Sequence, residues 1–279
     1  MYIRHIPARP LNAYVNYFYY LDGSMSFPHE KILPSTTIDM KFNLGSDFKV
    51  YKAGDVESFE IFKESWVVGI STSHHTLDWP TDVCLFGINF RPEGAYPFVR
   101  VPMSKLHNQV VPLNALWGHW ATEIRERLST APTVEAGFAL LEHLLFTRLY
   151  EASPELKSVK YAITEIARDC GTLGIRKLSD QIGISQTHLE TQFKRIIGIT
   201  PKEVARLYRF KHVLQLIDIT QPVDWGSVIY QARYYDQSHF NKDFVAFTGH
   251  NPTDYLRLRG QAQSKKVELG QLLRNLPTA

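Results

Sequence analysis

The sequence predicts an α+β protein of two domains: an N-terminal β-sandwich or barrel-like domain with trailing helices, and an all-helical C-terminal domain with two helix-turn-helix units. Three observations lead to this prediction. Short runs of β-branched and aromatic residues extend to about Phe98, apolar residues then recur at helical spacing, and one stretch near the C-terminus is repeated. The predicted boundaries are 1–150 for the β-rich domain, 151–157 for a linker, 158–260 for the helical domain and 261–279 for a polar tail.

The overall composition excludes fibrous and membrane-spanning classes. The 279 residues are 44% hydrophobic and 21% charged, which is typical of a globular protein with about two domains. No run approaches roughly 18 consecutive apolar residues, and the N-terminus lacks the pattern of a secretory signal. The two cysteines, Cys84 and Cys170, lie far apart and suit a reducing compartment. We therefore expect a cytoplasmic protein without membrane association.

Charge is distributed unevenly along the chain. Residues 1–154 hold 13 basic against 16 acidic side chains, whereas residues 155–279 hold 18 against 12. A basic C-terminal half favours contact with a polyanion such as DNA. The imbalance also lies within the ordinary scatter of globular proteins, so charge alone does not decide the partner.

Three runs in the N-terminal half carry the strongest strand pattern, namely residues 15–21, 37–44 and 83–90. The second and third alternate with period two, and turn-forming residues such as Asp22-Gly23 and Gly45-Ser46 follow the first two. This pattern predicts antiparallel strands in a sandwich or barrel.

The period changes from about Ser104 onward. Apolar residues from Leu113 to Leu128 predict one helix, and those from Phe138 to Leu149 predict a second. The polar, proline-containing segment 151–155 follows and makes the best linker.

A repeat organises the C-terminal half. Residues 185–203 and 236–254 align without a gap at a constant offset of 51. The matching positions are Gln186 with Gln237, His188 with His239, Leu189 with Phe240, Phe193 with Phe244, Gly198 with Gly249, and Pro201 with Pro252. Such self-similarity indicates a duplicated structural unit.

Each repeat contains the start and end signals of a helix. Ser185 and Asp236 are good N-caps because a side-chain oxygen can accept from the unpaired amides of the following turn. Gly198 and Gly249 suit the position just past a helix, where φ is positive.

A shorter apolar-patterned helix precedes each of these helices. In the first unit it spans residues 175–182 and ends at Gly183; in the second it spans 227–232 and is followed by Arg233. A helix, a short turn and a capped second helix form the helix-turn-helix pattern.

The second helix of each unit has one apolar and one polar face. At 100° per residue the apolar face carries Leu189, Phe193 and Ile196 in the first unit, and Phe240, Phe244 and Phe247 in the second. The opposite faces are polar and could lie in a major groove. The residues predicted to contact DNA are Thr187, His188, Glu190, Thr191, Lys194, Arg195, Gln237, Ser238, His239, Asn241 and Lys242.

Some of these residues have a second interpretation. His188 and His239 could hydrogen-bond a neighbouring helix and hold the turn instead of donating to phosphate. Lys194, Arg195 and Lys242 could be ordinary solvated charges.

The segment from Pro201 to Asp218 is predicted to form one helix between the two units. About 18 residues span roughly 27 Å, close to the ~34 Å between successive major-groove turns on one face of DNA. A single chain could therefore place both polar faces in adjacent grooves.

These motifs resemble the AraC family of bacterial transcription activators over residues 156–259. The most specific parts are Leu178-Ser179, Ser185-Gln186-Thr187-His188-Leu189 and Asp236-Gln237-Ser238-His239-Phe240. The resemblance implies seven helices, sequence-specific binding to double-stranded promoter DNA, contact with RNA polymerase and activation of transcription.

The chain departs from this family at two positions of the second unit. Ile229 and Arg233 stand where the family usually has Ala and Gly. A left-handed Arg233 would be strained by about 1 kcal/mol. We therefore expect the second unit to sit differently on DNA or to read less sequence than the first.

Residues 1–150 resemble, more loosely, the β-rich N-terminal domain of some of these regulators, which implies a small-molecule effector site or a homodimer surface. Aromatic residues could line a ligand cavity, with an arginine that reads an anionic group, or they could form the core. The candidates are Tyr17, Tyr19, Phe42, Trp66, Trp79, Phe86 and Arg91.

The sequence contains no pattern typical of catalysis, a cofactor or a metal. His74 and His75, if in a strand, would point to opposite faces and could not share an ion. The alternative function is a DNA-modifying or repair enzyme fused to a helix-turn-helix domain, which would need a reactive cysteine in a basic neighbourhood. Cys84 lies between Val83 and Leu85, and Cys170 follows Asp169.

Overall fold

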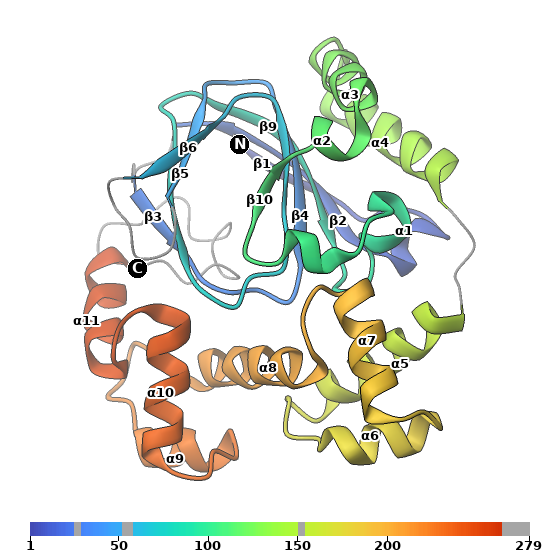
Figure 1. Ribbon diagram of the computed structural model, residues 1–279. Helices are drawn as coiled ribbons and strands as arrows, with labels where there is room; N and C mark the ends of the chain where they lie inside the picture. The colour runs from blue at the N-terminus through green and yellow to red at the C-terminus, as the bar shows by residue number, and fades with distance from the viewer. Residues whose placement is uncertain (25–28, 52–57, 150–153, 264–279) are drawn as a thin grey trace.

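The computed structural model describes residues 1–24, 29–51, 58–149 and 154–263 (Figure 1). Two β-sheets face each other in the N-terminal domain, and the helical C-terminal domain lies along one end of them (Figure 1). The strands are β1 (Tyr2–His5), β2 (Val15–Gly23), β3 (His29–Ile32), β4 (Ile38–Asn43), β5 (Phe48–Tyr51), β6 (Phe59–Phe62), β7 (Ser65–Val68), β8 (His75–Asp78), β9 (Val83–Phe90) and β10 (Val110–Pro112).

The larger sheet has the order β1-β2-β9-β4-β7-β10 and the smaller has the order β3-β8-β5-β6. All described pairings are antiparallel. The three runs with the strongest strand pattern form β2, β9 and β4, which are neighbours at the centre of the larger sheet. The predicted β-rich domain is therefore confirmed.

Alternation along these strands divides the apolar side chains between two cores. In β2, Tyr19 and Leu21 point toward the smaller sheet, whereas Phe18 points to the opposite face. Helices cover that opposite face, where Phe138 packs edge-on against Phe86.

The N-terminal domain contains the helices α1 (Tyr96–Val99), α2 (Asn114–Trp117), α3 (His119–Ser129) and α4 (Val134–Arg148) and the 3₁₀ turns η1 (Leu11–Ala13) and η2 (Met103–Leu106). The single helix predicted from Leu113 to Leu128 is wrong in one respect. Gly118 adopts φ 61° and separates α2 from α3, because a helix cannot continue through that backbone conformation.

The C-terminal helices are α5 (Pro154–Arg168), α6 (Ile175–Ile182), α7 (Gln186–Ile196), α8 (Pro201–Leu216), α9 (Trp225–Gln231), α10 (Gln237–Thr248) and α11 (Pro252–Gln263). Within the described residues these are the seven helices that the family resemblance implies. Residues 154–157 were expected in the linker but form the first turn of α5, because Pro is well suited to the first position of a helix. The rest of the predicted linker, residues 151–153, and the tail beyond Gln263 lie outside the described residues.

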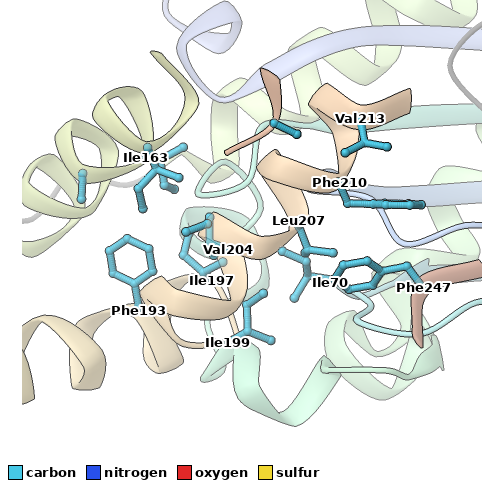
Figure 2. Close-up of a cluster of buried hydrophobic side chains, with 14 of the residues drawn as sticks. Ile70, Ile163, Phe193, Ile197, Ile199, Val204, Leu207, Phe210, Val213 and Phe247 are labelled. Atoms are coloured by element: carbon cyan, nitrogen blue, oxygen red, sulfur yellow. The ribbon is translucent and has the colours of Figure 1, made fainter. Parts of the chain in front are cut away.

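The core of the helical domain continues into the N-terminal domain. Leu33 and Ile70 are buried together with Leu207 and Phe247 of the helices (Figure 2). The two domains therefore share apolar contacts. In the described part of the chain, no helix has the length and apolar character needed to cross a membrane.

Candidate DNA-binding surface

The first helix-turn-helix unit consists of α6 and α7. Gly183 closes α6 at φ 79°, and the Ser185 hydroxyl accepts a hydrogen bond from the His188 amide at 3.2 Å. Leu189 and Phe193 of α7 are fully buried, so the opposite face of α7 points to solvent. The capping and the apolar face predicted from the sequence are both confirmed.

All six predicted contact residues of this unit are exposed: Thr187, His188, Glu190, Thr191, Lys194 and Arg195. Their surroundings differ. The Arg195 guanidinium lies 3.6 Å from the Glu155 carboxylate of α5, which draws it to the side of the helix. The His188 ring nitrogen Nε2 lies 2.9 Å from the Gln192 side-chain amide. The central strip of this face is therefore Thr187, Thr191 and Lys194.

The second unit consists of α9 and α10. The Asp236 carboxylate accepts a hydrogen bond from the His239 amide at 2.7 Å and begins α10. Phe240 and Phe244 are buried on the inner face. Gln237, Ser238, His239 and Lys242 are exposed and Asn241 is half-buried.

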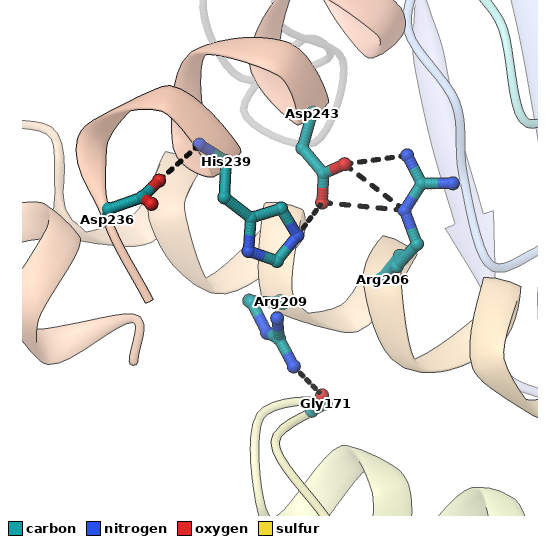
Figure 3. Close-up of polar contacts among 6 residues, drawn as sticks. All are labelled: Gly171, Arg206, Arg209, Asp236, His239 and Asp243. Atoms are coloured by element: carbon teal, nitrogen blue, oxygen red, sulfur yellow. Dashed lines mark hydrogen bonds and ion pairs between the residues drawn. The ribbon is translucent and has the colours of Figure 1, made fainter. Parts of the chain in front are cut away.

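His239 participates in an internal network (Figure 3). Its ring nitrogen Nε2 lies 3.9 Å from Oδ2 of Asp243, and its ring packs edge-on against Tyr234 at 5.2 Å between centroids. These contacts favour the structural interpretation of this histidine, in which it holds the turn.

Asp243 is itself buried and joins α10 to the linker helix α8. The Arg206 guanidinium donates to the Asp243 carboxylate through Nη2 at 2.7 Å and through Nε at 3.2 Å (Figure 3). Sequence reasoning missed this pair. The signal was present, since Asp243 is a charged residue at helical spacing on the buried face between Phe240 and Phe247.

A second arginine of α8 holds the two units together. Arg209 donates through Nη2 to the carbonyl of Gly171 at 2.9 Å (Figure 3). Its guanidinium lies 5.3 Å from the centre of the Tyr234 ring. Gly171 belongs to the loop that leads into the first unit, and Tyr234 belongs to the turn of the second. The helix α8 therefore fixes both units through its side chains.

Two parts of the chain match known family models. Residues 178–258 match a family model described as a helix-turn-helix domain, and residues 3–112 match one described as a domain of unknown function, DUF6597. The C-terminal domain is an AraC-type helix-turn-helix domain. A domain of this type is the part by which AraC-type transcription regulators bind DNA.

Solved structures with a related arrangement have low sequence identity to this chain. ToxT from Vibrio cholerae has 12% identity and a TM-score of 0.47, covering 86% of this chain and 98% of that one. ToxT from Vibrio cholerae with an unsaturated fatty acid bound has 11% identity and a TM-score of 0.42, covering 85% and 93%. The AraC-like transcriptional activator CuxR has 14% identity and a TM-score of 0.24, covering 71% and 72%. No curated protein matches the chain.

The seven predicted ligand residues lie in different parts of the N-terminal domain. Tyr19 and Trp66 are buried between the two sheets, with Tyr17 and Trp79 packed beside them.

Phe42 and Phe86 pair across β4 and β9 on the opposite face of the larger sheet, under α4. Side chains that are directly paired on neighbouring strands lie on the same face of a sheet, and for Phe42 and Phe86 this is the face that the helices cover. Arg91 is exposed and donates through Nε to the carbonyl of Asn12 at 3.1 Å. These positions favour the other interpretation, in which the aromatic side chains form the core.

A cavity of about 340 Å³ lies instead where the edges of the two sheets meet. It is lined by Val50, Tyr51, Glu60, Phe62, Val68, Gly69, Ser71, Ser73, His74, His75, Asn108, Gln109 and Val110. None of the seven predicted ligand residues is among them.

Both adjacent histidines line this cavity. His74 precedes β8, so strand alternation does not separate it from His75 as the sequence suggested. Burial lowers the pKa of His75 to about 4, so its ring is neutral at pH 7. Burial and the nearby charge of Lys31 lower the pKa of His74 as well. No group of three or more metal-ligating side chains occurs among the residues that the structure describes.

The two cysteines lie in different environments. The Cys84 sulfur is 3.4 Å from the Tyr20 hydroxyl on β2. Cys170 lies in the loop after α5 with a left-handed backbone, φ 49°. Both are partly exposed free thiols.

Proposed function

We propose that the chain is a sequence-specific activator that acts in the cytoplasm and places α7 and α10 in successive major grooves of promoter DNA. The observation that carries this proposal is the rigid connection of two polar recognition faces by one helix. The 16 residues of α8 span about 24 Å, and α7 and α10 lie beyond its two ends (Figure 1). That separation approaches the ~34 Å between successive major-groove turns.

The exposed residues of α7 divide by chemistry. The hydroxyls of Thr187 and Thr191 are short hydrogen-bonding groups suited to base edges, although Thr191 donates to the Thr187 carbonyl at 2.9 Å in the free protein. Lys194 at the end of the same face suits a phosphate.

On α10, Ser238 and Lys242 take the corresponding roles. Val245 lies on the same side and is 44% exposed, which suits apolar contact with a thymine methyl group. The proposal assigns His239 to the internal network rather than to DNA.

We further propose that the N-terminal domain controls DNA binding through a small molecule in the 340 Å³ cavity. The segment from Gly69 to His75 supports this role because it lines the cavity and also touches both units. Ile70 lies against Gly198 after α7, and His74 lies against Gly249 after α10. A ligand that moves this segment would shift the surface on which the ends of both recognition helices pack.

Two partners implied by the family stay part of the proposal. Contact with RNA polymerase would follow from activation at a promoter, and homodimerisation would be a second use of the N-terminal domain. Catalysis has no part in this proposal.

The test of DNA binding is selection of bound duplexes from a random library with the full chain, followed by footprinting. The proposal expects two conserved sequence elements about 10 base pairs apart on one face of DNA. Recovery of no common sequence, or of a single short element bound by α7 alone, would contradict it.

The test of ligand control is thermal-shift screening of a metabolite library against the parent and a Gln109→Trp variant that fills the cavity. A ligand that stabilises only the parent and changes its affinity for the selected duplex supports control through this cavity. If nothing stabilises the parent and it forms a concentration-dependent dimer, the domain is an interaction module without a ligand.

A further inference from the structure

Arg233 occupies a strained position in the turn of the second unit. Its φ is 52°, in the left-handed region, where a residue with a Cβ is strained. The first unit avoids this cost with Gly183 at φ 79°, around which a Cβ would meet no neighbour. Because the backbone would be satisfied by glycine, the presence of arginine points to a role for its side chain.

The Arg233 side chain reaches across to the first unit. Its Nη1 donates to the Thr172 hydroxyl at 3.2 Å and lies 3.8 Å from Oδ1 of Asp169. Both partners belong to the loop between α5 and α6. The arginine is 69% exposed, so the ion pair adds little to the stability of the fold. Its main effect is on the orientation of the second unit relative to the first.

The loop that receives Arg233 is itself fixed. Gly171 at φ 74° packs so closely on α8 that a Cβ would lie 1.9 Å from the Ala205 carbonyl oxygen. The Gly171 carbonyl accepts from Arg209, and the Thr172 hydroxyl lies 2.5 Å from Oδ2 of Asp169. Arg233 therefore contacts a rigid platform.

Two ion pairs contact the second unit at different places. Arg206 on α8 binds Asp243 within α10, and Arg233 binds the loop of the first unit. Tyr234 and Phe244 also pack against α8, and Arg233 adds the contact that joins the turn of the second unit to the loop before the first.

We propose that Arg233 is a positioning residue that sets the angle and spacing of α10 relative to α7. It thereby determines which separation of two half-sites the protein accepts. This inference rests on the proposed function, and it gives the departure from glycine in the second unit a purpose: selectivity for half-site spacing.

The test measures affinity of the full chain for duplexes that carry the two selected elements at separations varied one base pair at a time. Single-element duplexes are measured in parallel. The variants are Arg233→Gly, which removes strain and tether together, and Arg233→Asn, which keeps a residue tolerant of the left-handed region. Arg257→Ala, in an exposed pair on α11, controls for the loss of one surface charge.

We expect the parent and the Arg257→Ala control to prefer one separation by about tenfold over its neighbours, and both Arg233 variants to reduce this preference to about threefold or less. Binding of the Arg233 variants to single elements should stay within about twofold of the parent. Their thermal midpoints should equal or exceed that of the parent.

An unchanged spacing preference in both Arg233 variants would overturn the positioning role of Arg233 while leaving the proposed function standing. Equal losses of affinity at every separation and on single elements would also overturn it, because they would show a DNA contact rather than positioning. A parent that binds no duplex would overturn both proposals.

Discussion

The Arg206 guanidinium of α8 and the Asp243 carboxylate of α10 form a two-pronged contact, with Nη2 at 2.7 Å from Oδ1 and Nε at 3.4 Å from Oδ2. Asp243 is 3% exposed, and Arg206 supplies its closest hydrogen-bond donor. The pair converts the linker helix from a spacer into a support that orients the second recognition helix.

Removal of Arg206 should therefore destabilise the C-terminal domain. Arg206→Ala leaves a buried carboxylate without its main donor, and we expect a loss of about 2–3 kcal/mol in the free energy of unfolding. Chemical denaturation measures it. Arg257→Ala, which breaks the exposed pair with Asp254, should cost less than about 0.5 kcal/mol. Equal effects of the two substitutions would show that the Asp243 carboxylate does not need Arg206.

Two glycines with positive φ test the contact between the domains. A Cβ at Gly183 meets open space, whereas a Cβ at Gly198 would lie 2.8 Å from the Met103 carbonyl oxygen of η2. Gly183→Ala should cost about 1 kcal/mol of backbone strain, and Gly198→Ala roughly 1–3 kcal/mol more. Comparison of their unfolding free energies isolates the clash. Equal losses of unfolding free energy in the two variants would mean that η2 does not pack against the end of α7.

The half-buried ring of His75 predicts a loss of stability in acid. Its pKa is about 4 in the folded state against 6.5 in the unfolded chain, so between these values only the unfolded chain binds the proton. The free energy of unfolding should fall by about 1.4 kcal/mol per pH unit as pH decreases through this window.

His75→Gln should remove this part of the pH dependence when unfolding is measured from pH 7 to pH 4. His143→Gln, at an exposed position on α4, serves as the control. If His75→Gln retained the full slope of the parent, the ring would not be neutral in the fold.

Glu93 should change the stability with pH in the opposite direction to His75. Burial raises its pKa, partly offset by Lys160 and Arg91, so ionisation at neutral pH opposes folding. Glu93→Gln should raise the thermal midpoint at pH 7, and the gain should shrink as pH falls below the folded pKa and the parent becomes protonated. Glu135 is exposed, so Glu135→Gln should leave the thermal midpoint unchanged both at pH 7 and at the lower pH. A lower midpoint for Glu93→Gln at pH 7 would contradict the prediction.

The helical half could be predicted closely because its signals are local. Ser185 and Asp236 cap helices with their own side chains, and the glycines after α7 and α10 take the expected left-handed conformation. The strain at Arg233 was also predictable. Its partners Asp169 and Thr172 were not, because they lie about 60 residues earlier in the chain and meet it only after α8 has folded between the units.

The N-terminal half was predicted at the level of class but not of site. Alternation separates Tyr19 from Phe18, yet it cannot tell which face meets the second sheet and which meets the helices. The short strand β1 was missed, since four residues at a sheet edge carry little pattern and depend on pairing with β2. The cavity escaped prediction because its lining comes from loops and strand edges rather than from the aromatic runs.

The contact of α7 with DNA is tested most directly by the affinity of Thr191→Ala and Lys194→Ala for the selected duplex and for duplexes with single base changes, over a range of salt. Lys105→Ala, an exposed lysine on η2, is the matched control. If α7 lies in the major groove, Thr191→Ala changes base preference at one position, and Lys194→Ala weakens all duplexes alike while reducing the salt slope by about 0.9. If both variants bind every duplex as the parent does, the outward face of α7 does not contact DNA.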